Sequence, residues 1–247
     1  MRVHETDMSD GPTVDDVALL EAWCRGDRAA GAALFERHYA SVARFFHNKV
    51  SDAAQEDLIH ETFLACLEGI SRFRGQASFR TYLFGIAHRV LADHLRRRHR
   101  RVARLGSQAE ADAALEETPA IVFGLSPVAT AVHREEQRLL LEALRRIPLI
   151  HQVSLELHYW EELTAAEIGE ALGVPLGTAK TRLRDGRIYL EQQLRELARS
   201  PEQLQSTLDN LDRWARRVQA QLAPAAGANA DPDALAGADA LEARPRE

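Results

Sequence analysis

The sequence is poor in the residues that stabilise small exported domains or build sheets. Only two of its 247 residues are cysteine, and Cys24 and Cys66 are far apart and lack the spacing of metal ligands. This favours a reduced, cytoplasmic setting over a disulfide framework. Aromatic residues make up only 6% of the chain. No alternating run rich in Val, Ile and Thr is present either, so strands are not expected.

Long apolar runs are also missing. No run approaches the roughly 18 residues that a membrane-spanning helix requires, and the N-terminus lacks the basic-then-apolar pattern of an export signal. We therefore expect no membrane insertion. Ala, Leu, Glu and Arg dominate the composition, which predicts an all-α chain. Its length is sufficient for two small domains, each with a core of its own.

Shifts in composition divide the chain into six parts. Apolar residues recur at helical spacing in two blocks, and Gly, Pro and acidic residues gather between them. A break at Pro148 is expected between two helices of the second block, because proline disfavours helix in the residue before it. The predicted parts are a flexible N-terminus (1–14), a first helical domain (15–104), a flexible acidic linker (105–127), a second helical domain (128–195), an amphipathic C-terminal helix (196–222) and a disordered tail (223–247).

The stretch from 71 to 104 combines arginines with aromatic residues. Ten arginines occur there with a single acidic residue, Asp93, and Phe73, Phe79, Tyr82 and Phe84 lie among them. Guanidinium groups neutralise phosphates and aromatic faces accept unstacked bases, so the stretch predicts a surface for partly single-stranded nucleic acid. The alternative is a core helix with a solvated, charged end.

Residues 164–194 have the pattern of a helix-turn-helix. Thr164 can cap a short helix with Glu167 completing a capping box, and Gly173 suits a left-handed helix end. A longer helix with a basic face follows, which is the geometry that lays a recognition helix in the major groove. The alternative is an ordinary helical hairpin with a charged face. The apolar residues of the second helix that we expect to face the core are Leu176, Ala179, Leu183, Ile188 and Leu190.

Pairs of acidic residues occur at two places. Asp15 and Asp16 precede the first predicted helix, and Glu161 and Glu162 lie just ahead of the helix-turn-helix. Both pairs are interpreted as solvated residues of helix starts and loops.

Other chemistry finds little support in the residues. His60 and Glu61 begin like a zinc-protease motif, but Leu64 stands where the second histidine would be. His151 and His158 have no evident third ligand, so we expect structural histidines rather than a metal site. With no catalytic constellation, we predict no metal, no cofactor and no enzymatic activity. The alternative function from the enzyme class is a metal-dependent hydrolase that uses these histidines.

Three segments carry a resemblance to a known family. They are DLIHETFL (57–64), RFRGQASFRTYLFGIAHRVLADHLRRRHRR (72–101) and LRRIPLIHQVSLELHYWEELTAAEIGEALGVPLGTAKTRLRDGR (144–187). In this combination the chain resembles bacterial RNA polymerase sigma factors of the sigma-70 family, in the extracytoplasmic-function (ECF) subgroup. The resemblance implies an all-α fold in which a region 2 helical bundle and a region 4 helix-turn-helix are joined by a flexible linker, here followed by a helical extension.

The resemblance also implies residue roles. The residues expected at the clamp helices of the polymerase β′ subunit are Asp57, Leu58, Glu61, Thr62 and Phe63. Those expected at the −10 promoter element, where the aromatic part opens the duplex and captures flipped bases, are Phe73, Arg74, Phe79, Arg80, Tyr82, His88, Arg89, Arg96, Arg97 and Arg100. Those expected at the −35 element are Thr178, Lys180, Thr181, Arg182, Arg184 and Arg187.

The chain departs from the family pattern at a few of these positions. Tyr82 replaces a frequent Trp and keeps a stacking face, whereas Arg89 stands where Asn is frequent. Asp185 and Gly186 stand where many members have Arg and Ala. An acid there would repel phosphate, and glycine costs a helix up to about 1 kcal/mol. We therefore expect no direct DNA contact by Asp185.

The function implied is that of a sigma factor. Such a protein binds core RNA polymerase, through the β′ clamp helices and the β subunit, and directs initiation at promoter DNA, while the polymerase performs the catalysis. An anti-sigma factor is a further possible partner, and 196–222 is either a packing helix or a regulatory arm. The alternative is a helix-turn-helix regulator that binds duplex DNA without acting as a sigma factor.

Overall fold

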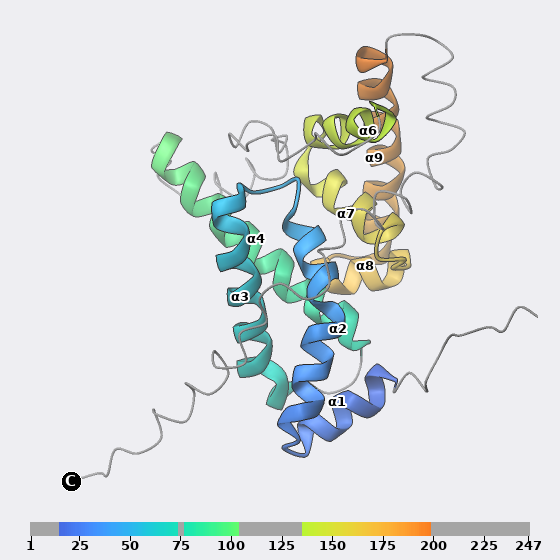
Figure 1. Cartoon of the computed structure of the whole chain (residues 1–247). Coiled ribbons are helices and arrows are strands. Elements are labelled where there is room, and N and C mark those ends of the chain that lie inside the picture. Colours follow the sequence, from blue (N-terminus) through green and yellow to red (C-terminus); the bar gives the residue numbers. More distant parts are fainter. Residues whose placement is uncertain (1–14, 74–76, 104–134, 199–247) are drawn as a thin grey trace, which may run out of the picture.

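The computed structural model describes residues 15–73, 77–103 and 135–198, and the regular structure in these ranges is entirely helical (Figure 1). This confirms the all-α prediction. The predicted N-terminus, linker and tail, and all but the first residues of the C-terminal helix, lie outside the described residues. The elements are α1 (Asp16–Cys24), α2 (Arg28–Phe46), α3 (Asp52–Gly69), the 3₁₀ helix η1 (Ile70–Arg72), α4 (Phe79–Ala103), α6 (Glu135–Arg146), α7 (Leu149–Tyr159), α8 (Ala165–Leu172) and α9 (Leu176–Leu197).

Several helix ends are fixed by the residues that the sequence indicates. Thr164 accepts a hydrogen bond from the Glu167 backbone N–H, and the Glu167 carboxylate accepts one from that of Thr164, which confirms the capping box. Gly173 ends α8 with φ at +66°, a conformation that glycine adopts without the steric cost of a Cβ. Pro148 separates α6 from α7, as predicted.

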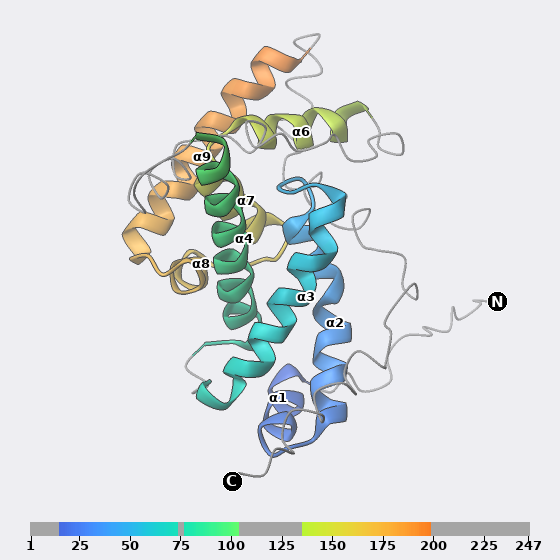
Figure 2. The ribbon, with the colours of Figure 1, turned by 90° about the vertical axis from the view of Figure 1, so that its left-hand side faces the viewer.

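Helices α1 to α4 form the N-terminal group. Figures 1 and 2 show α2, α3 and α4 side by side, with α1 across one end of α2. The Trp23 ring of α1 meets the edge or face of Phe35 and Phe79, with ring centroids 5.1 and 6.3 Å apart. These aromatic contacts bury one end of the bundle.

Asp16 joins α1 to α2 by charge. Its carboxylate accepts hydrogen bonds from Arg37 Nη1 at 2.5 Å and meets His38 Nε2 at 2.7 Å. Burial opposes the charged form, but these two partners outweigh it and hold the pKa of Asp16 below its ordinary value. Asp15 is exposed and caps α1, so the solvated interpretation fits Asp15 but is wrong for Asp16.

Helices α6 to α9 form the C-terminal group, in which α9 packs on the other three. Gly186 lies where α9 crosses α7: a Cβ at this position would be 3.2 Å from Leu155 Cγ and 3.3 Å from His151 Cβ. The glycine that the sequence marks as weakening the helix therefore allows a close helix contact. His151 Nδ1 lies 2.9 Å from the Arg182 carbonyl oxygen and bridges the same two helices.

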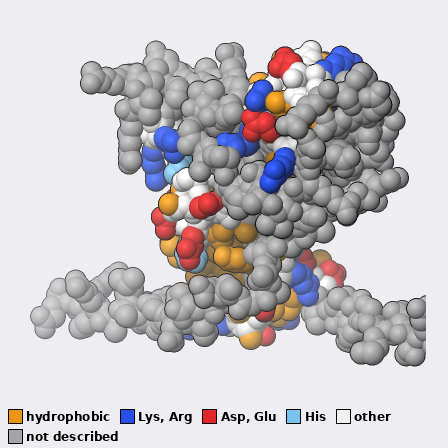
Figure 3. Space-filling view, turned by 45° about the horizontal axis from the view of Figure 1, so that its top comes forward, with side chains coloured by type: hydrophobic (Ala, Val, Ile, Leu, Met, Phe, Trp, Pro, Cys, Tyr) orange, Lys and Arg blue, Asp and Glu red, His pale blue; other side chains and the backbone are white. Residues whose placement is uncertain are grey.

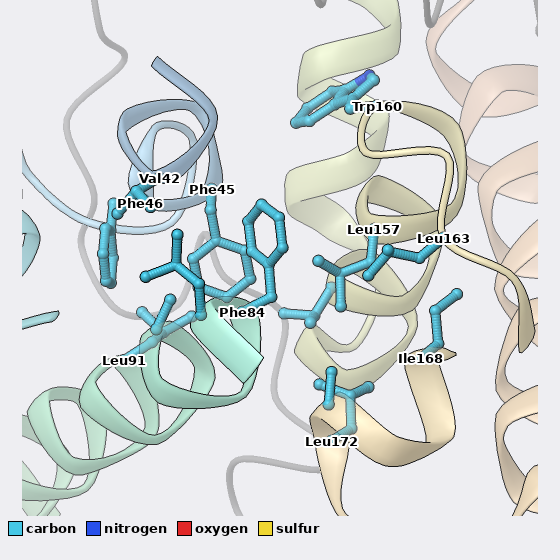
Figure 4. Close-up of a cluster of buried hydrophobic side chains, with 14 of the residues drawn as sticks. Val42, Phe45, Phe46, Phe84, Leu91, Leu157, Trp160, Leu163, Ile168 and Leu172 are labelled. Atoms are coloured by element: carbon cyan, nitrogen blue, oxygen red, sulfur yellow. The ribbon is translucent and has the colours of Figure 1, made fainter. Parts of the chain in front are cut away.

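The two groups share one core. Helix α4 packs on α8, and α2 contacts α7. Figure 4 shows Phe45 and Phe84 of the N-terminal group next to Leu157 of α7, with Leu172 of α8 nearby, and all four are buried. Apolar packing therefore continues from one group into the other.

Two glycines of α9 allow a test of this packing. We expect Gly186→Leu to destabilise the fold by about 1–3 kcal/mol, because its side chain must enter the occupied space against Leu155. Gly177 has open space around its Cβ position. Gly177→Ala should instead stabilise by about 0.5–1 kcal/mol through helix propensity. Urea unfolding followed by circular dichroism measures both, and a Gly186→Leu protein as stable as the parent would contradict the packing.

Candidate nucleic-acid interface

Helix α9 presents a polar and basic face outside the C-terminal core. Ala179, Leu183 and Leu190 are buried, as expected, whereas Leu176 and Ile188 are 46% and 48% exposed and were wrongly expected to face the core. Both lie off the narrow buried stripe of the helix. The predicted −35 residues follow the exposed side: Thr178, Lys180, Thr181, Arg184 and Arg187 are exposed, and Arg182 is half-buried.

Two side chains on this face are held by neighbours. Arg184 Nε donates a hydrogen bond to Asp185 Oδ1 at 2.9 Å, so the acid that breaks the family pattern orients an adjacent arginine. The Arg187 guanidinium lies over the Tyr159 ring, 5.5 Å from its centroid. Asp185 thus affects the basic face by orienting the Arg184 side chain.

The start of α4 and the preceding η1 bring together a second group of predicted residues. The rings of Phe73 and Tyr82 are 4.7 Å apart and tilted by 48°. They line a cavity of about 440 Å³ between α4 and α8, together with His88 and Arg89. Arg89 is exposed, and its Nε donates to the Gly85 carbonyl oxygen at 3.2 Å. Aromatic faces and a cation at the rim of a cavity are the features that accept an unstacked base.

Phe79 does not belong to this group. It is 3% exposed, and its ring packs on Trp23 and His38. Phe79 and Tyr82 are three residues apart on α4, but the first points into the N-terminal bundle and the second toward the cavity. The expectation that Phe79 captures a base is therefore corrected: it is a core residue. Arg74 lies outside the described residues.

Arg80 pairs with a buried acid, Glu161. Its Nη2 donates to Glu161 Oε2 at 2.7 Å, and Glu161 Oε1 accepts from Arg44 Nη2 at 3.2 Å. Glu161 is 3% exposed. The interpretation of Glu161 as a solvated loop residue is wrong, whereas its neighbour Glu162 is exposed. No local pattern indicates this contact, because its partners are 81 and 117 residues away in the sequence.

The far end of α4 carries the remaining predicted arginines. Arg96 Nη2 pairs with Asp93 at 2.5 Å, and Arg97 is exposed. Arg100 is part of α4, but its side chain lies outside the described residues. Basic and acidic side chains are interspersed on the described surface seen in Figure 3. The basic faces are therefore local features of a chain whose net charge is −6.

The five residues of α3 expected at the polymerase differ in exposure. Asp57 and Glu61 are exposed on one face. Leu58, Thr62 and Phe63 are buried, and Thr62 Oγ1 donates to the Leu58 carbonyl oxygen at 2.7 Å, so these three support the helix from inside and cannot meet a partner directly. Leu64 is not among the residues predicted to contact the polymerase. It is 56% exposed, and its position three residues after Glu61 places it on the outer face.

The histidines considered as metal ligands have structural partners. His158 Nδ1 lies 3.0 Å from the Leu163 carbonyl oxygen, and His151 bridges α7 to α9. Within the described ranges, no three His, Cys, Asp or Glu side chains come together as a metal site would require. Among the same residues, no helix combines the length and apolarity needed to cross a bilayer.

Comparison with known proteins identifies the family. The model described as Sigma-70 region 2 matches residues 34–101, and that described as Sigma-70, region 4 matches residues 137–190. The ECF RNA polymerase sigma factor SigW of Bacillus subtilis is 26% identical over 174 residues, or 70% of this chain and 93% of the relative. The ECF RNA polymerase sigma-E factor of Haemophilus influenzae is 26% identical over 183 residues, or 74% of this chain and 96% of the relative.

A solved structure shares the fold. CnrH, determined in complex with the cytosolic domain of CnrY, superposes with a TM-score of 0.51 at 18% identity, over 74% of this chain and 99% of that chain. A helical bundle joined to a capped helix-turn-helix with an exposed basic face defines an all-α DNA-binding protein. The chain belongs to the sigma-70 family as an ECF RNA polymerase sigma factor, and its function is to direct promoter-specific transcription.

His88 generates a prediction about pH. Burial, followed by the repulsion of nearby cations, first that of Arg182, lowers its pKa to about 4. The unfolded chain takes up this proton near pH 6.5 and the folded one only near 4, so stability is lost as pH falls through that window. His88→Gln should reduce the loss between pH 7 and pH 5 by about 1–2 kcal/mol. Urea unfolding at both pH values measures this, with exposed His60→Gln as control; equal losses in the two variants would contradict it.

Proposed function

We propose that this sigma factor reads two promoter elements with separate surfaces while bound to core RNA polymerase. Residues 15–104 act as region 2 and engage the −10 element, and residues 128–195 act as region 4 and engage the −35 element. The observation that carries this proposal is the exposed basic face of α9, projecting from a capped helix-turn-helix in the same chain as the aromatic cavity of α4.

The α9 face suits duplex DNA. Its first turns offer Thr178, Lys180 and Thr181, whose hydroxyl and ammonium groups can bond to base edges or phosphates. Arg184 and Arg187 follow about one and two turns later and can extend the contact along the groove. The shared core with α7 and α8 holds this face rigid, which a recognition helix requires to keep its register.

The Phe73–Tyr82 pair suits melted DNA. Two tilted rings beside the Arg89 guanidinium offer stacking and a phosphate partner for one displaced base. The arginine-rich end of α4 would then lie along the adjacent duplex. Phe79 supports this site from inside by anchoring the start of α4 to Trp23 and His38.

The outer face of α3 is proposed to bind the β′ clamp helices. Asp57, Glu61 and Leu64 place two acids beside an exposed apolar side chain. This is a suitable composition for the rim and centre of a small protein interface. The partners are thus core polymerase, including its β subunit, and promoter DNA in the cytoplasm, with catalysis by the polymerase. An anti-sigma factor is proposed as a regulatory partner; the neighbour CnrH was itself solved with a protein partner, the cytosolic domain of CnrY.

The rival function is a helix-turn-helix regulator acting without polymerase. Only the basic face of α9 favours it, and it leaves the Phe73–Tyr82 pair and the α3 face unused. Transcription with purified core polymerase on a promoter library separates the two functions. A sigma factor initiates from a subset of promoters only when added to core, whereas a regulator binds duplex DNA alone. The absence of initiation with an active core would overturn the proposal.

Two substitutions on α9 test the −35 assignment. If Lys180 reads a base, Lys180→Ala should weaken initiation at promoters with a −35 element by about 1–3 kcal/mol. If Lys180 contacts a phosphate, the substitution should weaken binding on all sequences and lower the slope of the salt dependence by about one. Arg195→Ala is the matched control, because Arg195 lies on the same helix and pairs with Glu191 near its far end. Equal effects of the two substitutions would contradict the assignment.

Tyr82 tests the melting assignment. Tyr82→Ala should reduce promoter opening by about 1–3 kcal/mol through the lost base stacking, with a much smaller effect on binding to closed duplex. Tyr82→Phe keeps the aromatic face and should open promoters nearly normally. The fluorescence of 2-aminopurine placed in the −10 element reports opening. An equal defect in both variants would show that the hydroxyl, not the stacking face, matters.

A further inference from the structure

Tyr82, the residue proposed to stack on a displaced base, lies against bare backbone at the end of α3. A Cβ placed on Gly69 would be less than 3.0 Å from the Tyr82 hydroxyl oxygen, closer than two such atoms can approach without bonding. This is the closest approach of its kind at any of the described glycines. The hydroxyl therefore occupies the space that a side chain at position 69 would need.

The backbone at Gly69 does not itself require glycine. Its φ and ψ are −89° and −14°, in the right-handed helical region that alanine also adopts. Gly69 is the last residue of α3, and glycine is less favourable than alanine in a helix. The missing side chain thus serves the contact with Tyr82 rather than the conformation of the chain.

A second contact fixes the same ring from the other side of η1. Gly69 immediately precedes η1 and Phe73 immediately follows it, with the Phe73 N–H donating to the Ile70 carbonyl oxygen at 3.0 Å. The rings of Phe73 and Tyr82 are 4.7 Å apart. We call Gly69 and Phe73 the Tyr82 seat. Among the described residues the hydroxyl has no hydrogen-bond partner, so shape rather than bonding holds it in the seat.

We propose that Gly69 is a positioning residue for promoter melting: its bare backbone receives the Tyr82 hydroxyl and thereby sets the orientation of the ring on which a displaced base stacks. This inference rests on the proposed role of Tyr82 in melting. Aromatic contacts depend on tilt and offset, so a stacking face has to be held at a defined angle. A ring that is already ordered also loses less conformational entropy when the base arrives.

A side chain at position 69 should displace the ring without unfolding the bundle. The hydroxyl has to move by several tenths of an ångström or more before contact with a Cβ becomes ordinary. A phenol ring is rigid and turns about only two side-chain torsions, so moving its hydroxyl reorients the whole stacking face. Both Gly69 and Tyr82 are only half-buried, which leaves the ring room to turn. Gly69→Ala should therefore leave the urea midpoint of unfolding close to that of the parent.

Fluorine NMR of the free, full-length protein labelled with 3-fluorotyrosine tests the seat without reference to transcription. The chain has four tyrosines, and Tyr82→Phe identifies the Tyr82 signal by its loss. Gly69→Ala should shift the Tyr82 signal and leave those of the other three tyrosines in place. An unmoved Tyr82 signal would overturn the inference, whatever the variant does in transcription.

Promoter opening with core polymerase tests the consequence, again with 2-aminopurine in the −10 element. Gly69→Ala should reduce opening about tenfold, within the range for a lost base stack, and change binding to closed duplex less than about twofold. The double variant Gly69→Ala/Tyr82→Phe should recover the opening of Tyr82→Phe alone. Without the hydroxyl, the nearest ring atom is Cζ, at 3.7 Å from the new Cβ, which is an ordinary contact.

The double variant is also the matched control, because it carries the same glycine substitution and lacks only the hydroxyl. Equal defects in Gly69→Ala and in the double variant would show that Gly69 acts on something other than Tyr82, and would overturn the inference. Failure of the proposed function has a different signature. If Tyr82→Ala left opening unchanged with active core, the melting assignment would be overturned, and the fluorine signal would still report separately whether Gly69 seats the ring.

Discussion

The burial of four charged side chains where the two helical groups meet is the constraint on which their arrangement depends: Arg44, Lys49, Glu156 and Glu161. Burial lowers the pKa of Lys49 and raises that of Glu156, so each would tend toward its neutral form without the other. Gln152 Nε2 donates to the second Glu156 oxygen at 2.8 Å, and Glu161 serves two arginines at once. Such a network tolerates only a narrow range of orientations, since a shift of about one ångström leaves charges without partners in a medium of low dielectric constant.

Helix α4 has to serve opposite requirements on different faces. Phe84 and Leu91 are buried in the core, while Tyr82 and Arg89 border a cavity and Arg97 is exposed. A helix with a single apolar stripe would pack on one side only and expose the other to solvent. Helix α4 instead packs on the N-terminal bundle on one side and on α8 on another. Gly85 makes the second covering possible. The helix that is proposed to handle DNA is thus also the one on which the C-terminal group rests.

Local features of the fold could be predicted from the sequence. Which residues of α4 face inward, and which charged residues pair across long sequence distances, could not. Thr164 with Glu167, Gly173 and Pro148 act within a few residues of themselves, so their patterns suffice. Phe79 and Tyr82 share an aromatic character and a helix, and only the positions of Trp23 and His38 decide which ring is buried. Glu161 looks like any loop acid, because its partners come from helices more than 80 residues earlier. The sequence accordingly predicts the −10 and polymerase sites only as continuous segments. Tertiary packing decides which residues of each segment are exposed.

An acidic chain that handles DNA needs its cations to be used selectively. With a net charge of −6, the molecule does not attract duplex as a whole, so nonspecific association must come from local patches. Several cations of the proposed DNA surfaces pair with acids of the same chain: Arg80 with Glu161, Arg96 with Asp93 and Arg184 with Asp185. The last two pairs are solvated and exchange readily with phosphate. In the first pair the acid is buried, whereas the Arg80 side chain is 31% exposed. A buried acid of the C-terminal group thus orients a cation of the helix that is proposed to meet DNA.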